Sequence, residues 1–345
     1  QGDGQTLSIQ AQAGQYFQNY GISFTEPWLF GTRPTALSVS VNQSLVRYSD
    51  QFGETQKLNI FSASAGLNRL LRWPDDYFSL YTGIQYQSYD FSNYPFQFGN
   101  ETEYNGSAKN FSFNVGLSRM SAGLDPIFPT QGSNLEASVK FTPPYSLFSD
   151  KNYATMTNVE KYKWLEFYKV KMKADVYNTV VGKLVLRSTA EMGFLNGYNK
   201  ELGAPPFERF YVGGTGLFGG RYDGRELLPL RGYENASSTG GTLEDVTPYG
   251  GATVYNRFAL ELRYPISMNQ TAKIYALSFL EGGNAWNSFG TYNPFQLKRS
   301  AGVGVRVYMG AFGLIGFDFA YGFDKTLMGT EPAGWKTHFL MKQSL

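Results

Sequence analysis

The chain has 345 residues, no cysteine, one histidine and a formal net charge of +2 at pH 7. These values exclude disulfide frameworks, cysteine-based zinc sites and paired-histidine metal motifs, and they give no electrostatic reason to expect a nucleic-acid partner. Aromatic residues make up 17 % of the chain and charged residues also 17 %, whereas soluble domains carry roughly a quarter charged residues. No apolar run approaches the ~18 residues of a membrane helix. The composition is typical of an all-β protein, either soluble or a transmembrane β-barrel with aromatic girdles, and we expect no metal and no cofactor.

Apolar and polar residues alternate with a period of two in segments that recur along the chain, which predicts β-strands. In the first of them Leu7 and Ile9 share one face, while Ser8 and Gln10 share the other. Each predicted strand is near the ~10 residues that a tilted strand needs to cross a membrane. In chain order the fourteen predicted strands span 5–15, 18–28, 35–49, 57–71, 77–91, 108–120, 130–142, 161–178, 182–196, 251–264, 272–286, 299–309, 312–322 and 335–344.

The connections between these strands alternate in length. Short turns at 30–35, 72–77, 178–182, 266–272 and 309–313 alternate with longer loops at 92–107, 143–160, 197–250, 287–298 and 323–334. Outer-membrane barrels of Gram-negative bacteria have this arrangement, with the short turns facing the periplasm. A soluble β-sandwich or propeller is the alternative. Strand length, aromatic content and loop alternation together favour an antiparallel transmembrane barrel that occupies the whole chain, 1–345, in contact with outer-membrane lipid.

The longest loop, 197–250, exceeds fifty residues and contains no predicted secondary structure. Loops of this length are usually functional or disordered. Apolar side chains such as Phe207 need burial, and the only large cavity of a single barrel is its lumen, so we expect the loop to fold inward. Arg231 would then need a carboxylate partner, because an unpaired buried charge is costly. Glu261 and Glu281, on the next two predicted strands, are the candidates.

An enzymatic barrel such as a lipase or protease is the least favoured function. A serine nucleophile would need a base, and the only histidine is His338, on a strand face that alternation turns toward the lumen. No nucleophile-elbow motif occurs in the chain. We therefore expect a satisfied or solvated lumenal histidine and no catalytic residue.

Several segments resemble one family of membrane proteins. The sequence FYVGG, which contains Gly213 and Gly214, precedes the tetrad Leu230, Arg231, Gly232 and Tyr233. This pair of motifs resembles the lumenal loop of the BamA/TamA superfamily of outer-membrane insertases and secretion pores, and its BamA branch above all. Further similar segments are SFTEPWLF at 23–30, ELRYP at 261–265 and FLEGGNAW at 279–286, where Glu281 replaces the usual aspartate and is followed by Gly283 and Trp286.

The resemblance implies a sixteen-stranded barrel in which Arg231 anchors the loop through Glu261 and Glu281. It also implies a lateral seam between the first and last strands, with Trp335, Phe339 and Leu345 on the final strand. The edge at this seam would template nascent outer-membrane β-barrel proteins, with accessory outer-membrane lipoproteins as further partners. The alternatives are a secretion pore of the two-partner or TamA type in the same superfamily, or a passive porin.

The resemblance is incomplete at both ends of the chain. Residues 23–30 align with the family's fourth strand, and only one predicted strand precedes them, so we expect about two strands to be missing. No periplasmic POTRA domains precede the barrel, which predicts a fragment or the ordered part of a longer protein. The last residue is Leu345 and not the usual aromatic. Whether Glu261, Glu281 or both hold Arg231 is left open by the sequence.

Overall fold

A computed structural model of the chain defines the wall of the barrel and most of the long loop. It describes residues 4–29, 31, 34–49, 55–94, 104–123, 125–149, 151–215, 226–237, 241–269, 271–310 and 312–342. Fourteen strands form one antiparallel sheet in which sequence neighbours pair, except that β9 pairs with β12. These strands are β1 (Thr6–Ala13), β2 (Phe17–Glu26), β3 (Thr35–Ser49), β4 (Thr55–Leu70), β5 (Phe78–Tyr94), β6 (Tyr104–Met120), β7 (Gly132–Phe141), β8 (Tyr168–Val181), β9 (Leu184–Asn196), β12 (Val254–Met268), β13 (Ala272–Trp286), β14 (Lys298–Met309), β15 (Gly313–Lys325) and β16 (Pro332–Lys342).

The fourteen predicted strands are confirmed, with one boundary clearly wrong. The strand expected to begin at 161 begins instead at Tyr168. Its first predicted residue belongs to the short helix α1 (Asn158–Lys161), which starts at a capping box formed by Thr157 and Glu160. The remaining short helices are η1 (Tyr145–Phe148), η2 (Tyr153–Thr155), η3 (Pro206–Glu208) and η4 (Phe289–Thr291). None of the helices in the described segments is long and apolar enough to cross a membrane.

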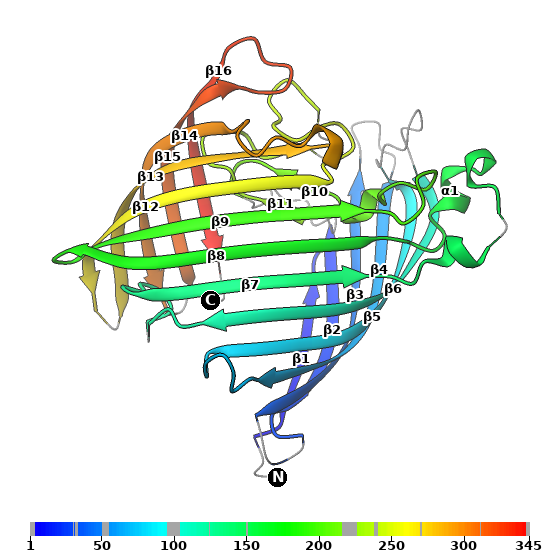
Figure 1. Ribbon diagram of the computed structural model, residues 1–345, viewed down its shortest axis with the longest axis horizontal. Helices are drawn as coiled ribbons and strands as arrows, with labels where there is room; N and C mark the ends of the chain where they lie inside the picture. The colour runs from blue at the N-terminus through cyan, green and yellow to red at the C-terminus, as the bar shows by residue number, and fades with distance from the viewer. Residues whose placement is uncertain are drawn as a thin grey trace.

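The sheet curls on itself, so that strands far apart in the sequence come to face each other (Figure 1). Within the described residues, β1 and β16 stand at the two ends of the strand order and form its edges. Edge strands present unpaired backbone donors and acceptors, which are the groups that another strand can pair with.

The two faces of the sheet differ as the alternation predicts. On β12, Phe258, Leu260 and Leu262 are exposed, whereas Glu261 and Arg263 are buried. The exposed apolar face lies on the outside of the curl, where a barrel contacts lipid, and the charged face lies inside it. The inner face is therefore the surface that meets the long loop.

The expectation that 197–250 lacks secondary structure is wrong. Besides η3, this segment contains β10 (Phe210–Val212) and β11 (Glu226–Leu228), which pair in parallel. Strands of three residues are too short for a period of two to be recognised in the sequence. We call the described residues of 197–250 the plug.

The plug lies inside the curl and is held there by a buried apolar cluster. Its Phe207, Phe210 and Leu230 belong to the same cluster as Leu58 on β4 and Tyr255 on β12. The rings of Phe207 and Phe91, on β5, stack with centroids 4.8 Å apart. Because β4 and β5 lie far from β12 in the strand order, the plug spans the interior between two parts of the wall.

Candidate functional site: attachment of the plug to the barrel wall

Arg231 lies against two adjacent wall strands and is only 4 % exposed. Its Nε donates to Glu281 Oε2 at 2.8 Å, and its Nη2 donates to Glu261 Oε1 at 2.7 Å. The guanidinium carbon also lies 3.7 Å from the centroid of the Phe279 ring, a cation–π contact. The sheet register explains this geometry, because Phe279 is the cross-strand partner of Glu261 and lies two residues from Glu281. Both candidate glutamates therefore contact the arginine.

A third carboxylate joins the two glutamates. Asp318 Oδ2 on β15 lies 3.7 Å from Arg231 Nη1. Each of the three acidic residues also contacts an arginine of the wall, so none of them depends on Arg231 alone: Arg257 pairs with Glu281, Arg263 with Glu261, and Arg306 with Asp318. Buried charges are tolerated only when they are paired and hydrogen-bonded in this way.

The same carboxylates keep the loop arginine charged. Burial lowers the pKa of Arg231, but Glu281, Glu261 and Asp318 outweigh burial and raise the pKa above its ordinary value. The Arg231 side chain is therefore a charged guanidinium that can pair with these carboxylates.

Gly232 allows the loop to approach the wall closely. Its φ is +87°, in the left-handed region that favours glycine. A Cβ at this position would lie 2.7 Å from Ser300 Cβ and 3.2 Å from the backbone N of Gly322. The Gly232 N–H donates to Nε2 of His338 on β16 at 2.9 Å. A side chain here would push the loop away from β14, β15 and β16 together.

Tyr233 completes the tip of the plug. Its ring is fully buried, and its hydroxyl donates to the carbonyl oxygen of Arg299 at 2.8 Å. The same hydroxyl accepts from the backbone N of Asp324 at 3.4 Å. Burial is the main reason that the pKa of Tyr233 is raised above its usual range, so the phenol stays neutral and can donate. The tetrad thereby reaches five consecutive wall strands, β12 to β16.

The predicted glycines shape the backbone around the tetrad. Leu230 N donates to the carbonyl oxygen of Gly214 at 2.9 Å, and Gly214 N donates to that of Tyr233 at 3.2 Å. Gly214 has a φ of +56°, and a Cβ on Gly213 would clash with the carbonyl oxygen of Glu234. On the wall, a Cβ on Gly283 would lie 3.2 Å from Leu230 Cδ1. These glycines make room for the loop.

The other predicted residues lie apart from this cluster. Trp286 is buried at the end of β13, where its ring meets the edge of Tyr292 at 4.9 Å. Trp335 and Phe339 on β16 are 61 % and 51 % exposed and lie on the outer face. Leu345 lies outside the described residues.

The plug meets β16 through the residues between the predicted seam aromatics. Besides the bond from Gly232 to His338, Lys336 Nζ lies 2.6 Å from Glu234 Oε1. Alternation placed His338 on the inner face, but sequence reasoning gave it no role. The edge strand is therefore attached to the plug by two polar contacts.

A second attachment, which the sequence did not predict, pairs carboxylates of the plug with lysines of the barrel wall. Glu208 of the plug pairs with Lys140 on β7 at 2.5 Å and with Lys169 on β8 at 3.3 Å. Glu226 pairs with Lys169 at 2.5 Å and with Lys171 at 2.8 Å. The plug thus presents a cation to the acidic part of the wall and two carboxylates to its basic part.

The segment YKVKMKADV, residues 168–176, contains a sequence signal for the second attachment. Lys169, Lys171 and Lys173 alternate with apolar residues, so three cations point toward the lumen and need anions there. Burial raises the pKa of Glu208, but Lys140 and Lys169 outweigh burial and hold that pKa below its ordinary value. Lys169 and Lys171 lower the pKa of Glu226 in the same way, so both carboxylates are charged at neutral pH.

Metal-binding geometry does not occur in the described segments, which contain no group of three or more His, Asp and Glu side chains placed to hold an ion. His338 Nε2 already accepts a hydrogen bond from Gly232, which occupies the lone pair that a general base would use. The arrangement is one of paired charges that hold a loop in place.

Comparison with known proteins places this geometry in a family. Residues 1–334 match the model of the Omp85 superfamily domain. A search of curated protein sequences found no significant match.

Among solved structures, the chain is similar to BamA from Haemophilus ducreyi lacking POTRA domains 1-3, with a TM-score of 0.70, 17 % identity, and coverage of 98 % of this chain and 65 % of that one. It is also similar to CdiB from Escherichia coli, with a TM-score of 0.55, 14 % identity, and coverage of 94 % and 52 %. For CdiB from Acinetobacter baumannii the TM-score is 0.50, the identity 12 %, and the coverage 97 % and 52 %. The chain spans less than two thirds of the length of each. At these identities the likeness concerns the fold.

The family match covers nearly the whole chain, and the fold is that of the BamA barrel. The chain therefore belongs to the Omp85 superfamily, and its β-barrel lies in the outer membrane of a Gram-negative bacterium.

Proposed function

We propose that this chain is the barrel portion of an insertase that folds β-barrel proteins into the outer membrane. It would act without covalent chemistry or a cofactor, by templating client strands at a lateral seam. Membership of the Omp85 superfamily supports this proposal, as does the greater similarity to a BamA barrel, with a TM-score of 0.70, than to CdiB, with 0.55 and 0.50.

The observation that carries the proposal is the attachment of the plug to an edge strand. Gly232 and Glu234 contact His338 and Lys336, and β16 is an edge of the sheet in the described part of the chain. An edge that templates a client strand has to be held in register while its outer backbone groups stay open for pairing. The plug contacts β16 on the inner face of the sheet, and in the described part of the chain these contacts do not involve the outer backbone edge of β16.

The partners implied by this role are nascent outer-membrane β-barrel proteins as clients and accessory outer-membrane lipoproteins as helpers. A client strand adds to the sheet through main-chain hydrogen bonds, so one edge can serve many client sequences. We accordingly expect a broad range of clients.

A secretion pore of the two-partner or TamA type is the second candidate, favoured by the likeness to the two CdiB structures. A pore would have to release the plug from both of its attachments in order to conduct. A passive porin is disfavoured because Arg231, Glu208 and Tyr233 are buried between plug and wall. Steady ion conductance and dependence on one cognate secreted polypeptide would identify a pore.

The test uses the absence of cysteine in the chain. The pair Glu234→Cys and Lys336→Cys allows a cleavable bifunctional cross-linker to tie the plug to the edge strand β16. The pair Glu226→Cys and Lys171→Cys is the matched control, because it ties the plug to β8, which is paired on both sides. Each protein is reconstituted in vesicles with an unfolded β-barrel client, and client folding is followed by heat-modifiable electrophoretic mobility.

We expect the protein to accelerate client folding over empty vesicles. The 234/336 cysteine pair without linker has lost the contact between Glu234 and Lys336 and is expected to accelerate folding less, and the cross-linker is expected to restore the acceleration, whereas cross-linking at 226 and 171 leaves the rate unchanged. Equal activity of the 234/336 protein with and without the linker would contradict the supporting role of the plug at β16. Failure to accelerate folding, together with conductance that cross-linking blocks, would identify the secretion pore instead.

A further inference from the structure

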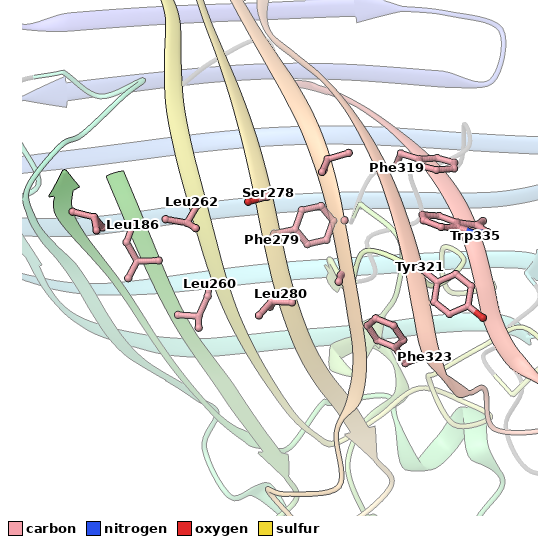
Figure 2. Close-up of a pocket in the computed structure, with 14 residues that line it drawn as sticks. Leu186, Leu260, Leu262, Ser278, Phe279, Leu280, Phe319, Tyr321, Phe323 and Trp335 are labelled. Carbon is pink, nitrogen blue, oxygen red and sulfur yellow. The ribbon is translucent and has the colours of Figure 1, made fainter. Parts of the chain in front are cut away.

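The outer face of the barrel has an apolar hollow beside the edge strand. It has a volume of about 950 Å³ and extends over β8, β9 and β12 to β16 (Figure 2). Leu260, Leu280 and Trp335 are among the side chains that line it. These residues lie on the exposed face of their strands, so the hollow opens toward the membrane.

The sheet register explains why a hollow forms here. One cross-strand row runs through Leu262, Ser278, Val303 and Phe319, and the next runs through Leu260, Leu280, Ala301 and Tyr321. In each row a small residue, Ser278 or Ala301, lies between larger side chains. Residues directly opposite each other on one face of a sheet are close neighbours, so a small residue leaves a gap that its neighbours border.

One side of the hollow is formed by aromatic rings that pack against each other. The rings of Phe319 and Trp335 stack with centroids 4.5 Å apart, and Tyr321 meets Trp335 edge-on at 5.2 Å. Figure 2 shows the labelled leucines from β9, β12 and β13 on one side and these aromatic residues on the other. These packed rings offer a flat, preformed surface to an aliphatic chain.

The hollow also shares a residue with the plug attachment. Phe279 lines it, and the same ring contacts the Arg231 guanidinium at 3.7 Å. A Cβ on Gly302 would lie 2.6 Å from Phe279 Cζ, so the ring occupies the space that a side chain on Gly302 would take. Phe279 is 3 % exposed and shares the inward face of β13 with Glu281, so it borders the hollow from the lumenal side of the sheet.

A cation lies at the loop end of the hollow. Arg299 precedes Ala301 by two residues on β14 and so shares its outward face. A Cβ on the outward-facing Gly282 would lie 3.9 Å from Arg299 Cγ. The Arg299 side chain pairs with Asp324 at 2.9 Å and yet is 68 % exposed, so it remains accessible to a second anion.

From these observations we propose that the hollow is a binding site for one anionic membrane lipid, with an acyl chain in the hollow and the headgroup at Arg299. The occupant is a lipid because the hollow is apolar, opens on the lipid-facing surface and has its cation at one end, which matches an amphiphile with an anionic head. The inference rests on the outer-membrane location and does not depend on the insertase proposal.

The test measures quenching of Trp335 by brominated lipids. The protein is reconstituted in phosphatidylcholine vesicles that contain increasing fractions of phosphatidylglycerol or phosphatidylcholine with dibrominated acyl chains. The Trp335 signal is obtained as the difference between the protein and its Trp335→Phe variant, since four other tryptophans are present. The brominated anionic lipid is expected to reach half-maximal quenching at about a fivefold lower mole fraction than the zwitterionic one, the ratio expected for one added cation contact.

Two variants separate the parts of the site. Ala301→Phe fills the hollow and is expected to remove the preferential quenching, whereas Ala137→Phe, an outward alanine on β7 far from the hollow, is expected to leave it intact. Arg299→Gln is expected to equalise the two lipids while quenching continues.

Several results would overturn the proposal. Quenching that follows mole fraction equally for both lipids in the unaltered protein would mean that Trp335 meets only bulk lipid. Quenching that Ala301→Phe leaves unchanged would place the lipid elsewhere. Loss of quenching only when an unfolded β-barrel client is added, with no lipid preference before it, would assign the hollow to a client segment.

Discussion

The backbone N–H of Gly232 donates a hydrogen bond to Nε2 of His338 at 2.9 Å, across 106 residues of sequence. One partner is the glycine that follows the loop arginine, and the other is the only histidine in the chain, on the edge strand β16. The loop motif and the edge of the barrel are therefore in direct contact.

Replacing Arg231 by alanine is expected to destabilise the barrel. The change removes the partner that Glu281 and Glu261 share, and breaking a buried ion pair costs about 3–5 kcal/mol. We expect the lower end, about 3 kcal/mol, because each glutamate keeps a wall arginine. Denaturant unfolding in detergent measures the loss. Arg299→Ala, at an exposed pair, is the control and should change the midpoint little; an equal effect of both changes would contradict the anchor role.

Gly232→Ala is expected to displace the tip of the plug. The left-handed backbone conformation alone costs an alanine about 1–2 kcal/mol, and the added Cβ would also meet Ser300 at 2.7 Å. Gly182→Ala is a matched control, because Gly182 also has a positive φ but has no atom within 4 Å of its Cβ position. We expect the first variant to lose clearly more stability than the second and to expose 228–237 to hydrogen exchange. Equal losses would show that backbone strain alone matters.

Two substitutions of His338 separate the packing of its ring from the hydrogen bond that its Nε2 accepts from Gly232. His338→Phe keeps a ring but leaves the buried Gly232 N–H without its acceptor, which costs about 1–3 kcal/mol. His338→Gln retains an acceptor oxygen and should restore part of the loss. Both are compared by thermal unfolding and by protease cleavage of the plug. A glutamine variant as weak as the phenylalanine variant would show that packing, and not the hydrogen bond, holds the tip.

The second attachment predicts a loss of stability in acid. The pKa of Glu208 is lowered in the folded protein because Lys140 and Lys169 outweigh the effect of burial. The unfolded state therefore binds the proton more readily, so the stabilisation is complete above the unfolded-state pKa of about 4.3 and is lost as the pH falls through the lower folded-state pKa. Unfolding midpoints measured from pH 7 to pH 3 should fall less steeply for Glu208→Gln, which cannot titrate. Parallel curves for the two proteins would exclude this carboxylate as the cause.

Much of the wall could be predicted from the sequence, because strand formation and face assignment are local. The period of two in 335–344 placed Trp335 and Phe339 on one face and His338 on the other, and the structure has them so. The start of β8 was missed, because Thr157 and Glu160 form a cap that competes with the strand. The β10 and β11 strands were missed, because three residues are too few for the pattern to appear.

The candidate site, too, was predictable only in its local features. The sequence by itself determined that Arg231 lies in a loop rich in apolar residues and that such a charge needs an acidic partner on an inward face. Only the tertiary structure decided that Glu261 and Glu281 share it, that Asp318 joins them, and that Glu208 and Glu226 attach the plug on the other side. The physical reason is that alternation depends on neighbouring residues alone, whereas these contacts depend on the register of many strands and on how the curled sheet brings distant strands around one loop.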